Sequence, residues 1–149
     1  MHGTRTRIAI IALLVVASAA GAWLAGPLFL VTRANAPVPA GFETVVKEGT
    51  WAGRDDFHFA SGSARILTDG RGAYVLRLEA FRVQNGPDIE LFLSSDAAYD
   101  ASDVVLGDVP ATDGSYNVPI PAGTDVSAVT HALVYCVPFH VLFATAALA

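Results

Sequence analysis

Apolar residues are spread very unevenly along the chain, and the longest apolar run lies near the N-terminus. Residues 8–31 read IAIIALLVVASAAGAWLAGPLFLV and contain no charged side chain. As a helix this stretch is about 36 Å long. About 20 residues suffice to cross a hydrocarbon core of roughly 30 Å. We therefore predict a transmembrane helix over residues 8–31.

Arginines on the two sides of this span predict its orientation. Arg5 and Arg7 precede it, and Arg33 follows it. The positive-inside rule places the side with more arginines in the cytoplasm. Residues 1–7 are therefore predicted to be a cytoplasmic N-terminus, and the chain is predicted to be a single-pass protein of the cell membrane with its larger part outside the cytoplasm.

The same stretch has a second interpretation, as a cleaved secretory signal. Its basic region would hold Arg5 and Arg7, and residues 17–19 and 20–22 are small-residue candidate cleavage sites. Against cleavage, the apolar run continues to residue 31, so that a cleaved product would begin with an exposed apolar tail. The uncleaved anchor is the favoured interpretation.

Beyond the span, the pattern changes to short apolar runs separated by turn residues. Residues 32–40 contain two prolines and are predicted to be an extended linker. Residues 41–149 show little helical periodicity and many strand-forming runs bounded by Gly, Asn, Asp and Pro. About seven to nine short strands are predicted, which indicates an all-β domain, an antiparallel β-sandwich over residues 41–149.

Three local patterns make this prediction more specific. Leu76 and Leu78 share one parity, whereas Phe81 has the other, and this flip predicts a β-bulge near Ala80. Residues 60–62 are predicted to connect a hairpin, and residues 69–72 to form a turn. Residues 95–103 are predicted to be a polar loop.

Composition and charge exclude several classes of protein. The chain has 149 residues, of which 53% are hydrophobic and 15% charged, so it is not disordered. Its formal net charge is −5, and all fourteen acids lie beyond residue 40, with only six of the nine Lys and Arg. An acidic domain does not offer the basic surface of a nucleic-acid-binding protein, and anionic lipid headgroups should repel it.

Cys136 is the single cysteine and the natural candidate for chemistry. One cysteine excludes an internal disulfide framework and a Cys-rich zinc module. Its apolar neighbours, in the sequence VYCVPFH, predict a buried thiol with a raised pKa. Outside the cytoplasm, thiols are usually oxidised. Cys136 is therefore either a packed core side chain or a thiol with a chemical role.

His140 is the nearest residue that could share a ligand with Cys136. On a straight strand, residues four apart lie about 13 Å from each other, too far for one metal ion. Pro138 could turn the chain between them. We predict no metal site and keep Cys136 and His140 as candidate cofactor ligands.

Aspartates crowd the middle of the domain without forming a known motif. Loop carboxylates can bind calcium, but their spacing matches no EF-hand, and Asx-turns explain them more simply. The six residues are Asp88, Asp96, Asp100, Asp103, Asp108 and Asp113. No nucleophile elbow, phosphate-binding glycine loop or His-Glu-x-x-His motif supports a hydrolase.

Several ordered segments together resemble the DM-thirteen domain, a Skeletor-type family described as an electron-transfer domain. The segments are SGSARIL at 61–67, LRLEAFRVQNGPD at 76–88 and VYCVPFHVLF at 134–143. Looser similarity at residues 106–107 and 116–121 extends the resemblance over roughly residues 41–148. A single anchor with one small domain resembles the prokaryotic form, which implies a bacterial cell envelope.

The resemblance implies a β-sandwich outside the cytoplasm and a redox role for Cys136, as a thiol or as a haem ligand. The first hypothesis is therefore a membrane-anchored redox or electron-transfer module with a redox or protein partner still to be identified. The alternative is a non-catalytic binding or structural β-sandwich at the cell surface, in which Cys136 is buried and inert.

Overall fold

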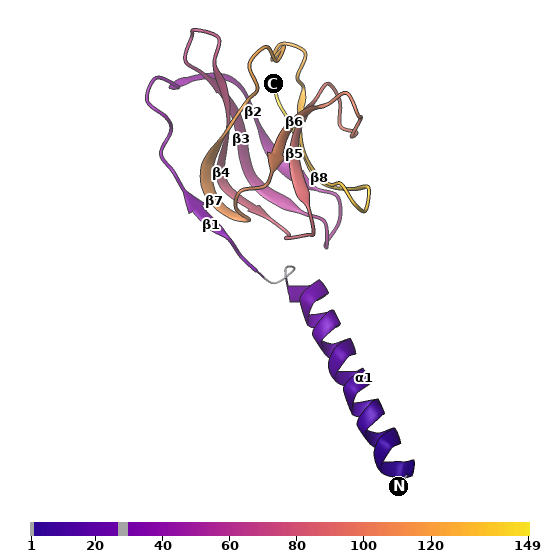
Figure 1. Ribbon diagram of the computed structural model, residues 1–149. Coiled ribbons are helices and arrows are strands. Elements are labelled where there is room, and N and C mark those ends of the chain that lie inside the picture. The colour runs from indigo at the N-terminus through magenta and orange to yellow at the C-terminus, as the bar shows by residue number, and fades with distance from the viewer. Residues whose placement is uncertain (1, 27–29) are drawn as a thin grey trace. The chain divides into compact units, whose positions relative to one another are not determined.

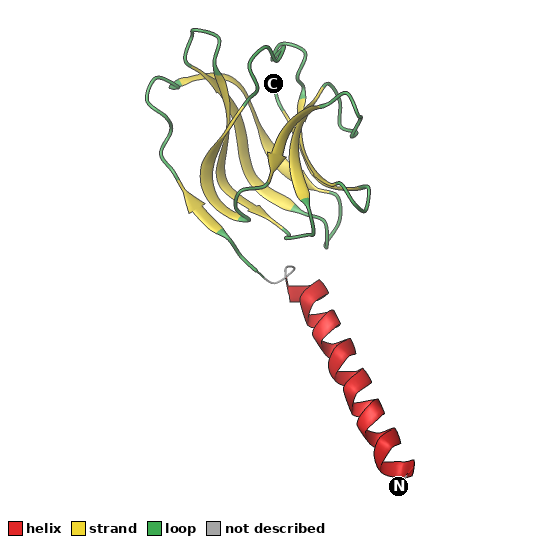
Figure 2. Ribbon diagram, in the orientation of Figure 1, coloured by secondary structure: helices red, strands yellow, loops and turns green. Residues whose placement is uncertain are grey.

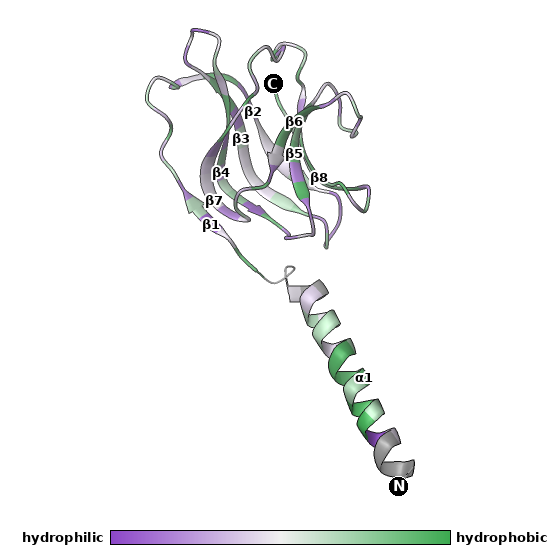
Figure 3. Cartoon of the chain, viewed as in Figure 1, coloured by the Kyte–Doolittle hydropathy of each residue, from purple (hydrophilic) through white to green (hydrophobic). Residues whose placement is uncertain are grey.

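A long apolar helix begins the chain. The computed structural model describes residues 2–26 and 30–149, and its helix α1 (His2–Ala25) is 24 residues long. The window Thr6–Trp23 is long and apolar enough to cross a membrane, and none of its residues is buried (Figure 3). Residues 27–29 of the predicted span lie outside the described residues, and Leu30 and Val31 are not helical. The helix therefore begins earlier than predicted, and its described residues end at Ala25.

The second unit, Val31–Ala149, consists of strands and the turns between them (Figures 1 and 2). Nine strands are described in it. They are β1 (Arg33–Asn35), β2 (Thr44–Gly53), β3 (Ala60–Thr68), β4 (Tyr74–Val83), β5 (Ile89–Ser94), β6 (Val104–Asp108), β7 (Asp113–Pro119), β8 (His131–Cys136) and β9 (Val141–Ala147). The predicted all-β class is confirmed.

The strands form one curled sheet in the order β1-β7-β4-β3-β2-β9-β8-β5-β6. The sheet folds over into two layers, and β2 belongs to both. Residues 44–50 of β2 pair with β3, and its end, Trp51–Gly53, pairs with β9. Leu76, Leu91 and Val134, from strands of both halves, are fully buried in one core cluster. The curled sheet thus packs against itself as a sandwich, which buries its apolar face between the layers (Figure 2).

Part of the segment predicted to be a linker is a strand. Arg33–Asn35 pairs with β7 in parallel, the one parallel pair among the described strands. The guanidinium of Arg77, itself buried, donates to the carbonyl oxygen of Ala36 at 2.6 Å. This contact and the strand pairing hold the start of the domain against β7 and β4.

The bulge predicted near Ala80 is present. The register between β4 and β7 shifts between Leu78 and Phe81, and Ala80 has φ 46°. The predicted hairpin at residues 60–62 is wrong, because β3 runs straight through them. Gly62, at φ 98°, instead marks a register shift opposite Ala80, so the glycine allows close approach of two strands rather than a chain reversal.

Both the turn predicted at residues 69–72 and the loop predicted at residues 95–103 are present. Residues 69–72 form the expected turn, in which the Asp69 carboxylate accepts the N–H groups of Arg71 and Ala73. Residues 95–103 form the predicted loop, but one of its side chains takes part in apolar packing. Its Tyr99 stacks on Tyr135 with ring centroids 3.9 Å apart and covers a small apolar cluster on the outer face of β5 and β8.

Candidate functional site

Cys136 ends β8 and points into the sandwich. It lies between Ile89 of β5 and Val141 of β9 in the strand registers, and its side chain belongs to the main core cluster. Only 2% of the residue is exposed. The burial predicted from its apolar neighbours is therefore confirmed.

The thiol has polar partners in the backbone on two sides. Its Sγ–H donates to the carbonyl oxygen of Pro87, with 3.0 Å between sulfur and oxygen. Burial raises the pKa of the Cys136 thiol, a hydrogen bond from the backbone N–H of Phe139 lowers it, and the charge of Asp88 raises it again, for a net increase. The thiol is accordingly protonated at neutral pH, and a protonated thiol is a poor nucleophile.

His140 lies in the turn that joins β8 to β9. The residue is exposed and has φ 54°, and its N–H donates to the carbonyl oxygen of Val137 at 3.3 Å. The chain does reverse around Pro138, but it leaves the imidazole at the surface and the thiol in the core. The structure therefore does not present Cys136 and His140 to a common ligand.

The other histidines of the domain have their own partners. The Nδ1 atom of His58 lies 2.8 Å from a carboxylate oxygen of Asp55. The Nδ1 atom of His131 lies 2.8 Å from the hydroxyl of Thr130.

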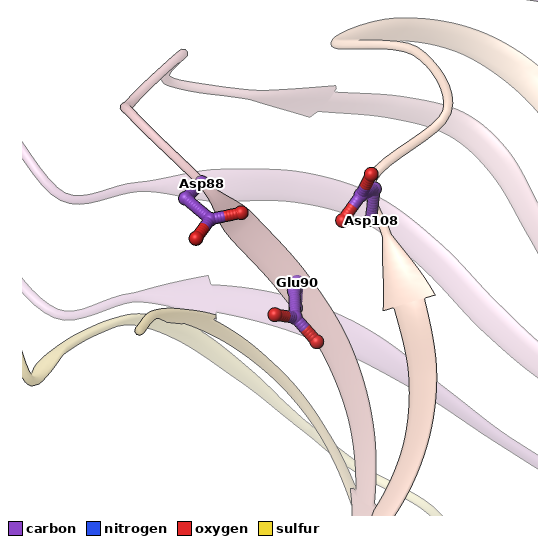
Figure 4. Close-up of side chains that lie close together, drawn as sticks. All are labelled: Asp88, Glu90 and Asp108. Carbon is purple, nitrogen blue, oxygen red and sulfur yellow. The ribbon is translucent and has the colours of Figure 1, made fainter. Parts of the chain in front are cut away.

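A group of three carboxylates was missed by the sequence analysis. One ligand oxygen from each of Asp88, Glu90 and Asp108 lies within 4.8 Å of the others (Figure 4). Glu90 pairs with Asp108 across β5 and β6, and Asp88 is two residues before Glu90. The spacing of residues 88 and 90 on one strand face was visible in the sequence, but the pairing with residue 108 was not.

The negative charge of Glu90 is unfavourable in this group. Partial burial raises the pKa of Glu90, and the charges of Asp88 and Asp108 raise it further. Carboxylate oxygens are ligands for hard cations such as calcium. The arrangement can therefore relieve its repulsion by taking up either a proton or a cation.

Two described surface grooves lie away from the cysteine. One is lined by residues of β2, β3 and β9, including Glu48 and Arg65. The other lies beside Arg77 and Glu79 on the outer face of β3 and β4. Neither groove includes Cys136 or His140.

Comparison with known families assigns the domain. Residues 54–148 match the family described as "Electron transfer DM13". The chain belongs to the DM13 family. Neither the curated proteins nor the solved structures gave a match. The DM13 match runs from just after β2 to the end of β9, and so includes Cys136, His140 and the three carboxylates.

Proposed function

We propose that this DM13 protein is a single-pass membrane protein whose domain transfers electrons outside the cytoplasm, in a bacterial cell envelope. The family match over residues 54–148 is the observation that carries the electron-transfer role. The apolar window Thr6–Trp23 supports the anchor. Arg5 and Arg7 before it favour a cytoplasmic N-terminus.

Cys136 is our candidate for the redox centre. Its thiol lies at the end of β8, directly before an exposed turn, so an opening of residues 137–140 is a short route to solvent. Once exposed and deprotonated, the thiolate attacks a disulfide of a partner protein. A new S–S bond forms, the partner's S–S bond breaks, and its leaving sulfur takes up the proton that Cys136 released.

A haem ligated by Cys136 does not fit this arrangement. Cys136 is 2% exposed, its thiol donates to the carbonyl oxygen of Pro87, and the side chain belongs to the packed core. His140, the second candidate ligand, is at the surface. We therefore derive no step through haem.

The burial of Cys136 also favours a second candidate function. In it the domain is a non-catalytic binding or structural module, and the cysteine only fills core volume. Free cysteine is often buried as a small apolar residue, and the raised pKa of this thiol agrees with that use.

Thiol labelling of the full chain in detergent micelles separates the two functions. We expect a maleimide to label Cys136 roughly 100-fold more slowly in the native than in the denatured protein. If the turn opens locally, this native rate should hardly change in low urea, because little surface is exposed on opening. An exposed reporter, Ala98→Cys in a Cys136→Ala background, should label at once and serves as the control.

The packing function predicts a different dependence of labelling on urea. A native labelling rate that rises with urea as steeply as global unfolding would contradict the redox assignment and support the packing function. Under the packing function, Cys136→Ala should lower the free energy of unfolding by about 1–2 kcal/mol. It should leave the binding of any partner unchanged.

A further inference from the structure

Two large aromatic side chains are exposed at the tips of loops. Phe57, between β2 and β3, is 80% exposed, and Phe139, between β8 and β9, is 67% exposed. Neither is part of a described core cluster. Aromatic residues are enriched at protein–protein interfaces relative to the rest of the surface.

Contacts place both loops at the same end of the sandwich. The N–H of Arg54 donates to the carbonyl oxygen of Phe143 at 3.0 Å, and the ring of His58 meets that of Phe143 at 4.8 Å. Phe143 lies in β9, which begins directly after the turn that carries Phe139. Figure 1 shows the two loops, coloured purple-magenta and yellow, at the same lower end of the domain.

Both loops are held in defined conformations. The Asp55 carboxylate accepts the N–H groups of Phe57 at 2.9 Å and of His58 at 2.7 Å. The turn at residues 137–140 is tied to the neighbouring loop, because the N–H of Val137 donates to the carbonyl oxygen of Asp88 at 3.3 Å. Ordered loops lose less conformational entropy on binding.

The same end is strongly acidic. Its carboxylates belong to Asp55, Asp56, Asp88, Glu90 and Asp108, and we call these five residues together with Phe57 and Phe139 the acidic-aromatic end. Three arginines lie at this end with these acids and Asp113. Arg54 is in the same loop as Phe57, Arg82 is paired with Asp113 at 3.7 Å, and Arg33 lies opposite Asp113 in the strand register. The surface around the two aromatic rings therefore has a net negative charge.

We propose that the acidic-aromatic end is the docking surface for an electron-transfer partner protein whose contact face is basic. This inference rests on the proposed electron-transfer function. Exposed aromatic side chains at the same end as several carboxylates fit a partner whose contact face combines apolar side chains with lysines. The docked partner would cover the turn next to Cys136.

A lipid surface is the less suitable occupant. Anionic headgroups repel the five carboxylates, and the acids beside the rings would have to approach the headgroups if the rings entered the bilayer. A basic protein gains attraction from the same groups. Insertion of this end into lipid would therefore overturn the proposal.

The test uses the full chain in phosphatidylcholine nanodiscs and cytochrome c as a basic redox protein. We expect saturable binding at about 20 mM salt and at least roughly tenfold weaker binding at about 200 mM. Cytochrome c with acetylated lysines is the matched probe, since it lacks the positive charges. It should bind at least roughly tenfold more weakly than the unmodified protein.

Variants locate the surface. The triple variant Asp56→Asn, Asp88→Asn, Asp108→Asn and the single variant Phe139→Ser should each weaken binding about tenfold. The control triple Asp96→Asn, Asp100→Asn, Asp103→Asn removes the same charge from the opposite end of β5 and should bind like the wild type. Val45→Ala is the control for an exposed apolar side chain elsewhere.

Three results would overturn the proposal. They are no binding of cytochrome c at low salt, equal loss of binding in the control triple, and stronger quenching by brominated lipid in a Phe139→Trp variant than in the wild type, whose Trp23 already lies in the apolar window, in the absence of a protein partner. The proposed function is tested separately. If docking behaves as expected but the native labelling rate of Cys136 rises with urea as steeply as global unfolding, the docking surface stands and the role of Cys136 falls.

Discussion

The environment of single side chains decides most of the chemistry available to this domain. Cys136 and Glu90 are both ionisable groups whose charged forms are disfavoured, the first chiefly by burial and the second by burial together with two neighbouring acids. In each case the neutral form is stabilised in the folded protein. At neutral pH, repulsion among the carboxylates of Asp88, Glu90 and Asp108 therefore lowers the stability of the folded domain.

Replacing Glu90 by Gln should make stability less sensitive to pH. The pKa of Glu90 is raised above its ordinary value of 4.5, so the folded chain binds a proton more tightly than the unfolded chain. The free energy of unfolding consequently falls as pH rises through the interval between the two pKa values. We expect Glu90→Gln to be more stable than the wild type at pH 7, by about 0.5 kcal/mol.

Urea unfolding at pH 7 and at pH 3.5 measures this effect. The advantage of Glu90→Gln over the wild type should shrink at the lower pH, where Glu90 is protonated in both states. Glu43→Gln removes a carboxylate outside the group, and its effect should not follow the same pattern. An equal advantage of Glu90→Gln at both pH values would contradict this account.

At the scale of the elements, β1 depends on a single glycine of its neighbour β7. A Cβ atom built on Gly114 of β7 would lie 1.9 Å from the carbonyl oxygen of Ala34 in β1, and Gly114 has φ 130°. Only a residue without a side chain allows the parallel pairing of Arg33–Asn35 with β7. The short first strand is therefore held by backbone proximity.

Gly114→Ala should displace β1 and lower the free energy of unfolding by about 1–3 kcal/mol. Hydrogen exchange gives the local readout, because the N–H of Ala36 donates to the carbonyl oxygen of Ser115 at 2.8 Å and should lose protection. Gly123→Ala is the matched control. Its φ is 85°, but no atom lies within 4 Å of the added Cβ, so we expect a smaller loss and unchanged protection of Ala36. Full protection of Ala36 in Gly114→Ala would show that β1 does not need the glycine.

The whole chain combines an apolar helix with an acidic β-domain. The helix carries the only window apolar enough to cross a membrane within the described helical residues, and the domain carries all fourteen acids of the chain. The two units therefore suit different environments. Attachment of the protein to a membrane should depend on α1.

Leu14→Arg should weaken membrane retention. An arginine at the centre of a spanning helix costs about 2.5–3.5 kcal/mol on insertion scales. We expect part of the full chain to become extractable by alkaline carbonate, with Leu14→Ala retained as the control. The intact mass of the retained wild type should include residues 1–31. A mature protein lacking them would support the cleaved-signal interpretation instead.

Much of the local structure could be predicted because it depends on neighbours in the chain. Charge-free residues within 8–31 predicted the helix, and the flip in parity near Ala80 predicted the bulge. The error at residues 60–62 had a physical cause. A glycine permits both a tight turn and a close approach of strands, and only the partner strand distinguishes them.

The amino-acid sequence by itself determined the apolar helix, the all-β class of the domain and the apolar surroundings of Cys136. These properties follow from hydrophobicity, strand periodicity and turn residues over short stretches of chain. Only the tertiary structure decided that Cys136 faces the core beside Pro87, that Asp108 meets Glu90, and that Phe57 and Phe139 share one end. Each of those depends on which distant strands pair and in what register, and that choice is made by packing of the whole sheet.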